Sequence, residues 1–208
     1  MSLTITLAEW QARAVQCDSL ISNAHKMDVN TGAPILPALD KEQITIAAFL
    51  NLFIAWEGFL EDAMTKLMSG SPTISGKFPT RYVIPPTQVA AKELVIGNNK
   101  YFDYANIDFV KRLTKMYFDS GYPFEPHLSS ISSDLADLRT MRNASAHITS
   151  TTQRALEALA QRIFVTPRPG ITLYQLLTAV HPHSPSGQTV FSESKDKLLV
   201  AAGLIANG

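Results

Sequence analysis

The residues best suited to chemistry in this chain are an arginine and a histidine five positions apart, Arg142 and His147, with Asn143 directly after the arginine. Imidazole titrates near neutrality, so a histidine can take a proton from the 2′-hydroxyl of RNA or protonate the leaving 5′-oxygen. A guanidinium binds a phosphate bidentately and stabilises the charge that builds on its non-bridging oxygens. An asparagine can orient either group. These three side chains are therefore sufficient for cleaving RNA without a metal ion.

A helix predicted from Ser132 to about Ile148 positions these side chains. At about 100° per residue, its apolar residues fall on one arc, which must face the core. That arc is formed by Ile131, Leu135, Leu138, Met141 and Ile148. Arg142 and His147 lie about 140° apart and flank the polar face, whose Arg142 margin adjoins the apolar arc. Between them lie Arg139, Asn143 and Ala146. A small residue at the centre of this face suits close approach by a second helix or by a phosphodiester.

The string Arg142-Asn-Ala-Ser-Ala-His147 resembles the R-x4–6-H motif of the HEPN superfamily, in its RN-x3-H form. The helix that carries it resembles the same family through its Leu-x2-Leu-Arg-x2-Arg-Asn pattern. An earlier stretch, Trp56-Glu-Gly-Phe-Leu-Glu-Asp62, is similar to the W-E-x-F-x-E-D segment of HEPN proteins of the RiboL-PSP and MAE-like types. The resemblance covers roughly residues 44–165.

The resemblance implies a helical bundle that forms a homodimer, in which the motif helices of two protomers face each other and build one composite ribonuclease site. Arg142 would then stabilise the scissile phosphate, His147 would act as general acid and base, and Asn143 would be the polar residue after the arginine. The products would carry a 2′,3′-cyclic phosphate or 3′-phosphate and a 5′-hydroxyl. The implied setting is a toxin–antitoxin or other defence system, with an antitoxin or a nucleotidyltransferase as the protein partner.

Several alternatives remain open at this point. The same face would also serve a non-catalytic HEPN-like module that binds RNA or a partner protein. A purely structural bundle would leave Arg142 and His147 far from any interface. Arg139, one turn before Asn143, either extends a phosphate-binding site or forms a surface salt bridge with Asp134 or Asp137.

Charge and cysteine content exclude several other classes of function. The chain has 18 Lys+Arg and 18 Asp+Glu, and this balance excludes a broad electrostatic grip on nucleic acid or on a membrane surface. Five of the eight arginines nevertheless lie between Arg139 and Arg168, a stretch with Glu157 as its one acid, which permits a local arginine-lined cleft. The single cysteine, Cys17, excludes a disulfide framework and a multi-cysteine zinc site. We expect a cytoplasmic protein that needs no metal and no cofactor.

The rest of the chain reads as helices separated by Pro, Gly and Ser loops, which predicts an all-α, HEPN-like single domain over residues 1–208 with N- and C-terminal helical extensions. Thr6 and Glu9 form a predicted capping box for a helix over 7–26, with Ile5 and Trp10 as its hydrophobic staple. Asp40 is the predicted cap of a second helix that ends at Ser69-Gly70. Residues 71–106 are predicted to be the least regular region. Later helices are predicted over 107–120, 150–165, 173–180 and 193–206.

The second of these helices contains the longest apolar run, Ile44 to Trp56. Thirteen residues are too few to cross a bilayer, which takes about 20. The run therefore predicts a buried helix and no membrane partner. The N-terminus has no basic segment of the kind that opens a secretory signal. Glu57 and Glu61 follow the run and are predicted to be surface or inter-helix hydrogen-bonding groups.

Overall fold

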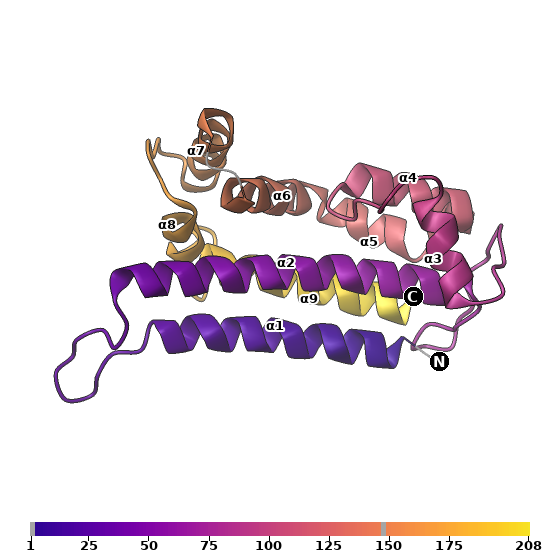
Figure 1. Ribbon diagram of the computed structural model, residues 1–208, viewed down its shortest axis with the longest axis horizontal. Helices are drawn as coiled ribbons and strands as arrows, with labels where there is room; N and C mark the ends of the chain where they lie inside the picture. The colour runs from indigo at the N-terminus through magenta and orange to yellow at the C-terminus, as the bar shows by residue number, and fades with distance from the viewer. Residues whose placement is uncertain (1–2, 147–148) are drawn as a thin grey trace. The chain divides into compact units, whose positions relative to one another are not determined.

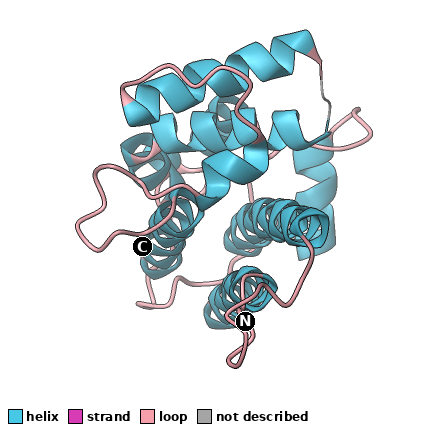
Figure 2. Cartoon of the chain, turned by 90° about the vertical axis from the view of Figure 1, so that its left-hand side faces the viewer, coloured by secondary structure: helices cyan, strands magenta, loops and turns pink. Residues whose placement is uncertain are grey.

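In the computed structural model, every regular element of the described residues, 3–146 and 149–208, is a helix, and these residues form no strand (Figures 1 and 2). The prediction of an all-α protein is confirmed. In chain order the elements are α1 (Thr4–Ala24), α2 (Ala38–Met68), α3 (Gln88–Ile96), α4 (Ile107–Tyr117), the 3-10 turn η1 (Asp119–Gly121), α5 (Phe124–Ser130), α6 (Ser132–Ala146), α7 (Ser150–Phe164), α8 (Leu173–Thr178) and α9 (Val190–Asn207).

The chain forms two compact units, each assembled from segments far apart in the sequence. The first unit consists of Met1–Gln11, Ala55–Ala136 and Lys197–Gly208. The second consists of Ala12–Ile54 and Asp137–Asp196. All four boundaries fall inside helices, namely α1, α2, α6 and α9. Within each unit, the segments of α1 and α2 run side by side (Figures 1 and 2).

An aromatic cluster forms the core of the first unit between α1 and α2. The rings of Trp10 and Trp56 meet edge to face with centroids 5.8 Å apart, and the ring of Phe59 lies 5.7 Å from that of Trp56. None of the three side chains is more than 3% exposed. Apolar burial of this kind is the main favourable term in folding, so this cluster anchors α1 to α2.

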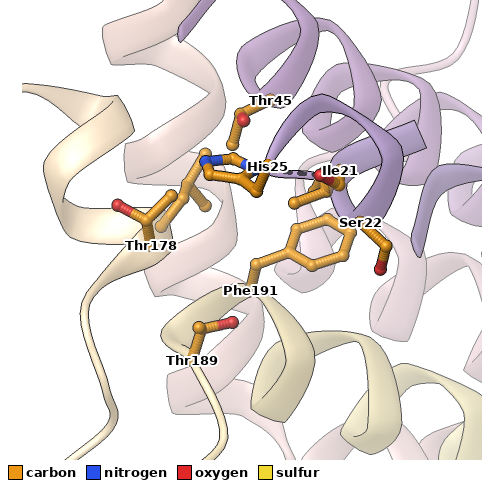
Figure 3. A pocket seen from close by; sticks show the side chains of 8 residues that line it. Ile21, Ser22, His25, Thr45, Thr178, Thr189 and Phe191 are labelled. Carbon is orange, nitrogen blue, oxygen red and sulfur yellow. Dashed lines mark hydrogen bonds between the residues drawn. The ribbon is translucent and has the colours of Figure 1, made fainter. Parts of the chain in front are cut away.

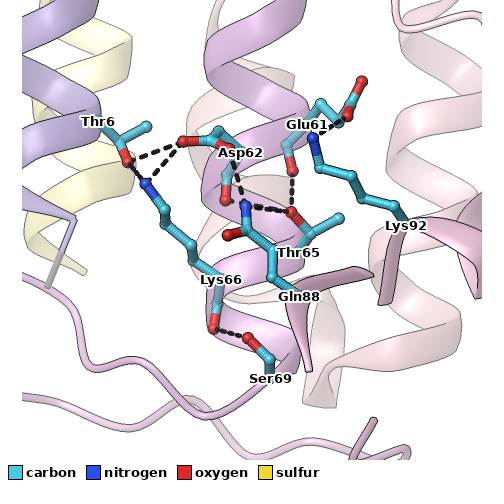
Figure 4. Close-up of polar contacts among 8 residues, drawn as sticks. All are labelled: Thr6, Glu61, Asp62, Thr65, Lys66, Ser69, Gln88 and Lys92. Carbon is cyan, nitrogen blue, oxygen red and sulfur yellow. Dashed lines mark hydrogen bonds and ion pairs between the residues drawn. The ribbon is translucent and has the colours of Figure 1, made fainter. Parts of the chain in front are cut away.

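A polar network beside this cluster shows that Thr6 does not cap α1 (Figure 4). The hydroxyl of Thr6 accepts a hydrogen bond from Lys66 Nζ at 2.7 Å and donates to Asp62 Oδ2 at 3.3 Å. The helix begins at Thr4, so Thr6 lies within it and is 3% exposed. Ile5 is 56% exposed and forms no staple with Trp10. The predicted capping box is wrong because partners on α2 engage the threonine that would have formed it.

Asp62 is the centre of this network, and its charge is expected to stabilise the fold. Burial by itself raises the pKa of Asp62, but hydrogen bonding and attraction from Lys66, together with the Gln88 amide, outweigh it and bring the pKa below its usual value. Lys66 Nζ lies 2.7 Å from Oδ2, and Gln88 Nε2 donates to Oδ1 at 2.8 Å. A carboxyl with a lowered pKa contributes stability above its unfolded pKa and loses it as pH falls through the folded value.

We therefore expect Asp62→Asn to lower the free energy of unfolding by about 1–2 kcal/mol at pH 7. The difference should begin to shrink as pH falls below about 3.9, the usual pKa of an aspartate, and should vanish only below the lowered pKa of the folded Asp62 carboxyl. Urea unfolding at pH 7, and again at a pH below the folded pKa of Asp62, measures this effect. Glu61→Gln is the matched control, because Glu61 forms a more exposed ion pair with Lys92 and exposed pairs contribute little. An equal loss at both pH values would show that shape, and not charge, is what matters at Asp62.

Several helix ends lie where the sequence places them. Asn106 caps α4 and accepts a hydrogen bond from the Phe109 backbone, and Thr172 with Gln175 forms the capping box of α8. Gly70, with φ +104°, follows the end of α2. Two other details differ from the prediction. α2 begins at Ala38, so Asp40 lies in its first turn, and α5 (Phe124–Ser130) was not expected.

α2 is the one helix of the described residues that is also long and apolar enough to cross a membrane. Its most apolar 18-residue window has a mean hydropathy of 1.5, and 44% of that window is buried in the protein. The core helix of a soluble protein meets the same criteria. Phe49, Leu52 and Phe53 of this helix are each at most 3% exposed, as the prediction of a buried helix requires.

Candidate functional site

α6 carries the predicted site residues and buries its apolar residues in the core. Leu135, Leu138 and Met141 are at most 4% exposed, so the predicted core arc is confirmed for these residues. Arg142 is exposed and Asn143 is half-buried. Ala146, one turn after Arg142, is also exposed. His147 and Ile148 lie outside the described residues.

The Arg142 guanidinium lies next to the amide of Asn143. Its Nη1 donates to Asn143 Oδ1 at 3.5 Å, which is at the long limit of a hydrogen bond. Among the described residues, Asn143 is the partner of this guanidinium, so most of its five N–H donors face solvent. Ser145 Oγ donates to the Arg142 carbonyl at 2.6 Å and occupies one carbonyl of the last helical turn. The arrangement leaves a guanidinium free to take a phosphate bidentately.

Two carboxylates on α6 each form an ion pair with a cationic side chain of another helix. Asp134 binds Lys197 Nζ of α9 at 2.8 Å, and Asp137 forms an ion pair with Arg162 of α7. The sequence offered these two acids as partners for Arg139. Arg139 itself is half-buried, one turn before Asn143 on the same helix. The pairing of Asp137 with Arg162 joins the first half of α6 to the last turn of α7.

The part of α6 that follows Ala136 and the whole of α7 therefore form a helical hairpin in the second unit. α6 ends at Ala146, and Thr149 caps α7, with its hydroxyl accepting from the Thr152 backbone and the Thr152 side chain accepting in return. Leu156, Leu159 and Ala160 form the buried face of α7. Since Asp137 meets Arg162 and the connection between the helices is short, α7 runs back antiparallel to α6. The exposed side chains Arg142, Arg154 and Arg162 all belong to this hairpin.

The second stretch that resembles HEPN proteins lies in the first unit and is built into its core. Trp56 and Phe59 belong to the aromatic cluster, and Asp62 is the centre of the polar network. Glu61 pairs with Lys92 of α3 at 2.7 Å, which confirms the prediction of an inter-helix contact (Figure 4). This stretch therefore positions α1, α2 and α3 and holds no exposed reactive group among these four residues.

A pocket of about 240 Å³ in the second unit was missed by sequence reasoning (Figure 3). His25 Nδ1 lies 2.9 Å from the Ile21 carbonyl, so Nδ1 carries the proton, and Nε2 accepts from the hydroxyl of Tyr174 at 3.1 Å. No signal in the sequence links these residues, because Tyr174 lies 149 positions after His25. The pocket is lined by Ile21, Ser22, His25, Thr45, Leu177, Thr178, Thr189 and Phe191.

The site residues placed by the structure are thus Arg142, Asn143 and Arg139 on α6, on a hairpin with further exposed arginines. They share no wall with the pocket at His25. Comparisons of the chain with protein-family models, with curated proteins and with solved structures find no match.

Proposed function

We propose that this protein is a metal-independent endoribonuclease of HEPN type, with a composite active site at a homodimer interface and a cytoplasmic role as a toxin or defence nuclease. The observation that carries the proposal is the polar face of α6. Arg142 is exposed there with Asn143 at its side, at the head of the six-residue string that ends in His147. Leu135, Leu138 and Met141 of the same helix are buried in the core.

The proposed reaction is a transesterification followed by release. His147 takes the proton of the 2′-hydroxyl, and the 2′-oxygen attacks the adjacent phosphorus. Arg142 binds the non-bridging oxygens and stabilises the charge that builds on them, while Asn143 holds the guanidinium in place. The bond from phosphorus to the 5′-oxygen breaks, and the protonated His147 of the partner subunit gives that oxygen its proton. The products are a 2′,3′-cyclic phosphate and a 5′-hydroxyl.

Two protomers suit this reaction better than one. One proton is removed and another is delivered on opposite sides of the phosphorus, and two histidines, one from each protomer, can share these tasks. Ala146 is exposed on the motif face, and a small side chain there allows a second helix to approach closely. Arg139 lies one turn before Asn143 and would add a phosphate contact. An antitoxin or a nucleotidyltransferase would be the protein partner that controls such an enzyme.

The proposal is tested by incubating the purified full chain with single-stranded RNA in excess EDTA. We expect cleavage that EDTA does not reduce, products with cyclic-phosphate and 5′-hydroxyl ends, and a dimeric mass by light scattering. Cleavage that stops in EDTA would contradict the mechanism. RNA that is bound but left intact would instead favour the non-catalytic binding module.

A further inference from the structure

Arg168 lies over an aromatic ring just after the end of α7. Its Cζ is 3.7 Å from the centroid of the Phe164 ring, which is the geometry of a cation–π contact. Phe164 is half-buried and Arg168 is exposed. The ring thus covers one face of the guanidinium plane, and the opposite face is accessible to solvent.

The segment that carries Arg168 is folded back by an unfavourable backbone conformation. Val165 adopts φ +60°, a left-handed conformation that is costly for a β-branched residue. Pro167 and Pro169 flank Arg168 and restrict its backbone. The Ile171 N–H then donates to the Arg168 carbonyl at 3.3 Å and closes a turn in which Gly170 has φ +71°. Strain of this kind concentrates at functional positions.

Two side chains of α7 hold this turn independently of Arg168. The Gly170 N–H donates to Glu157 Oε1 at 2.8 Å, and Gln153 Nε2 donates to the Ile171 carbonyl at 3.1 Å. Gln153 also donates to Glu157 Oε1 at 3.1 Å. The hydrogen bond from Gly170, followed by that from Gln153, keeps the pKa of Glu157 below its usual value, so its carboxylate stays charged at neutral pH. Arg168 is therefore presented by a fixed turn, and its removal should leave that turn in place.

We propose that Arg168 and Phe164 form a stacking subsite for one unpaired base of single-stranded RNA. The proposal rests on the proposed function for its choice of RNA as the ligand. Guanidinium planes and aromatic rings are the platforms on which proteins stack unpaired bases, and the N–H groups in the guanidinium plane can reach the adjoining phosphate. The base would lie on the open face of Arg168. A duplex offers no free base face, so the subsite would select single strands.

Binding of fluorescent RNA oligonucleotides to the full chain tests this subsite, in a His147→Ala background that prevents cleavage. We expect Arg168→Ala to weaken the binding of a single strand about 5- to 100-fold. Arg168→Lys should bind the single strand nearly as weakly as Arg168→Ala does, because lysine keeps the positive charge but lacks the planar guanidinium on which a base stacks. We also compare an oligonucleotide of abasic nucleotides. Its affinity for the parent protein should be as low as the affinity of the normal oligonucleotide for Arg168→Ala. Arg13→Ala, which removes an exposed arginine of α1, is the matched control and should have little effect.

Phe164→Leu gives a second test that keeps most of the packing volume, and circular dichroism checks that each variant is folded. Equal affinity of Arg168→Ala and its parent, full rescue by lysine, or no binding of RNA by the full chain would each overturn the subsite. The proposed function fails separately. A chain that binds RNA through Arg168 but never cuts it would retain the subsite and lose the nuclease. If cleavage depends on Arg142 and His147 but is unaffected by Arg168→Ala, the nuclease proposal is retained and the subsite is rejected.

Discussion

Replacement of His147 by alanine is expected to lower the rate of RNA cleavage by about 10²- to 10⁴-fold, the usual contribution of a general acid–base group. The proposed mechanism moves two protons, and His147 is the one titratable residue in the motif string. The fold should remain intact because the buried face of α6, formed by Leu135, Leu138 and Met141, is unchanged. Initial rates on a single-stranded RNA in EDTA measure the effect, and circular dichroism confirms the helix content.

His183→Ala is the matched control, because His183 is exposed in the loop after α8 and should leave the rate unchanged. Arg142→Ala should reduce the rate by about 10²- to 10³-fold, as loss of a group that stabilises the developing charge does. Arg142→Lys should recover only part of this loss, because lysine cannot bind the phosphate bidentately. If His147→Ala cuts RNA at the parent rate, the motif is not the active site and the ribonuclease proposal fails.

Replacement of Trp56 by alanine is expected to lower the free energy of unfolding by about 3–5 kcal/mol. Trp56 is 1% exposed and contacts both Trp10 and Phe59, so its removal leaves a cavity between α1 and α2. A loss of this size is a large share of the roughly 5–15 kcal/mol that stabilises a typical domain. Urea unfolding followed by far-ultraviolet circular dichroism measures the change.

Ile54→Ala is the control for this variant. It lies two residues earlier on α2 with 61% of its side chain exposed, and its truncation should change the free energy of unfolding by at most about 0.5 kcal/mol. Trp56→Phe should retain much of the stability because it keeps a ring in the cluster. Similar losses for Ile54→Ala and Trp56→Ala would show that the cluster is not the core of the first unit.

The sequence by itself determined the helical class, the ends of several helices and the orientation of α6. Asn106 caps α4 through the Phe109 N–H, and Thr172 with Gln175 caps α8, because each of these interactions is completed within a single turn. The burial of Leu135, Leu138 and Met141 on one face of α6 follows from helical periodicity. Local geometry was sufficient in each case because all the interacting atoms belong to neighbouring residues.

Only the tertiary structure decided which partner each polar side chain has. Thr6 resembles a cap in the sequence, yet it bonds Lys66, 60 positions later. Asp137 forms an ion pair with Arg162 of α7, 25 positions later. For Thr6, which is 3% exposed, the physical reason is that burial removes competing water and strengthens the hydrogen bond with Lys66. Such choices depend on which helices pack together, and that information is not local to any stretch of the chain.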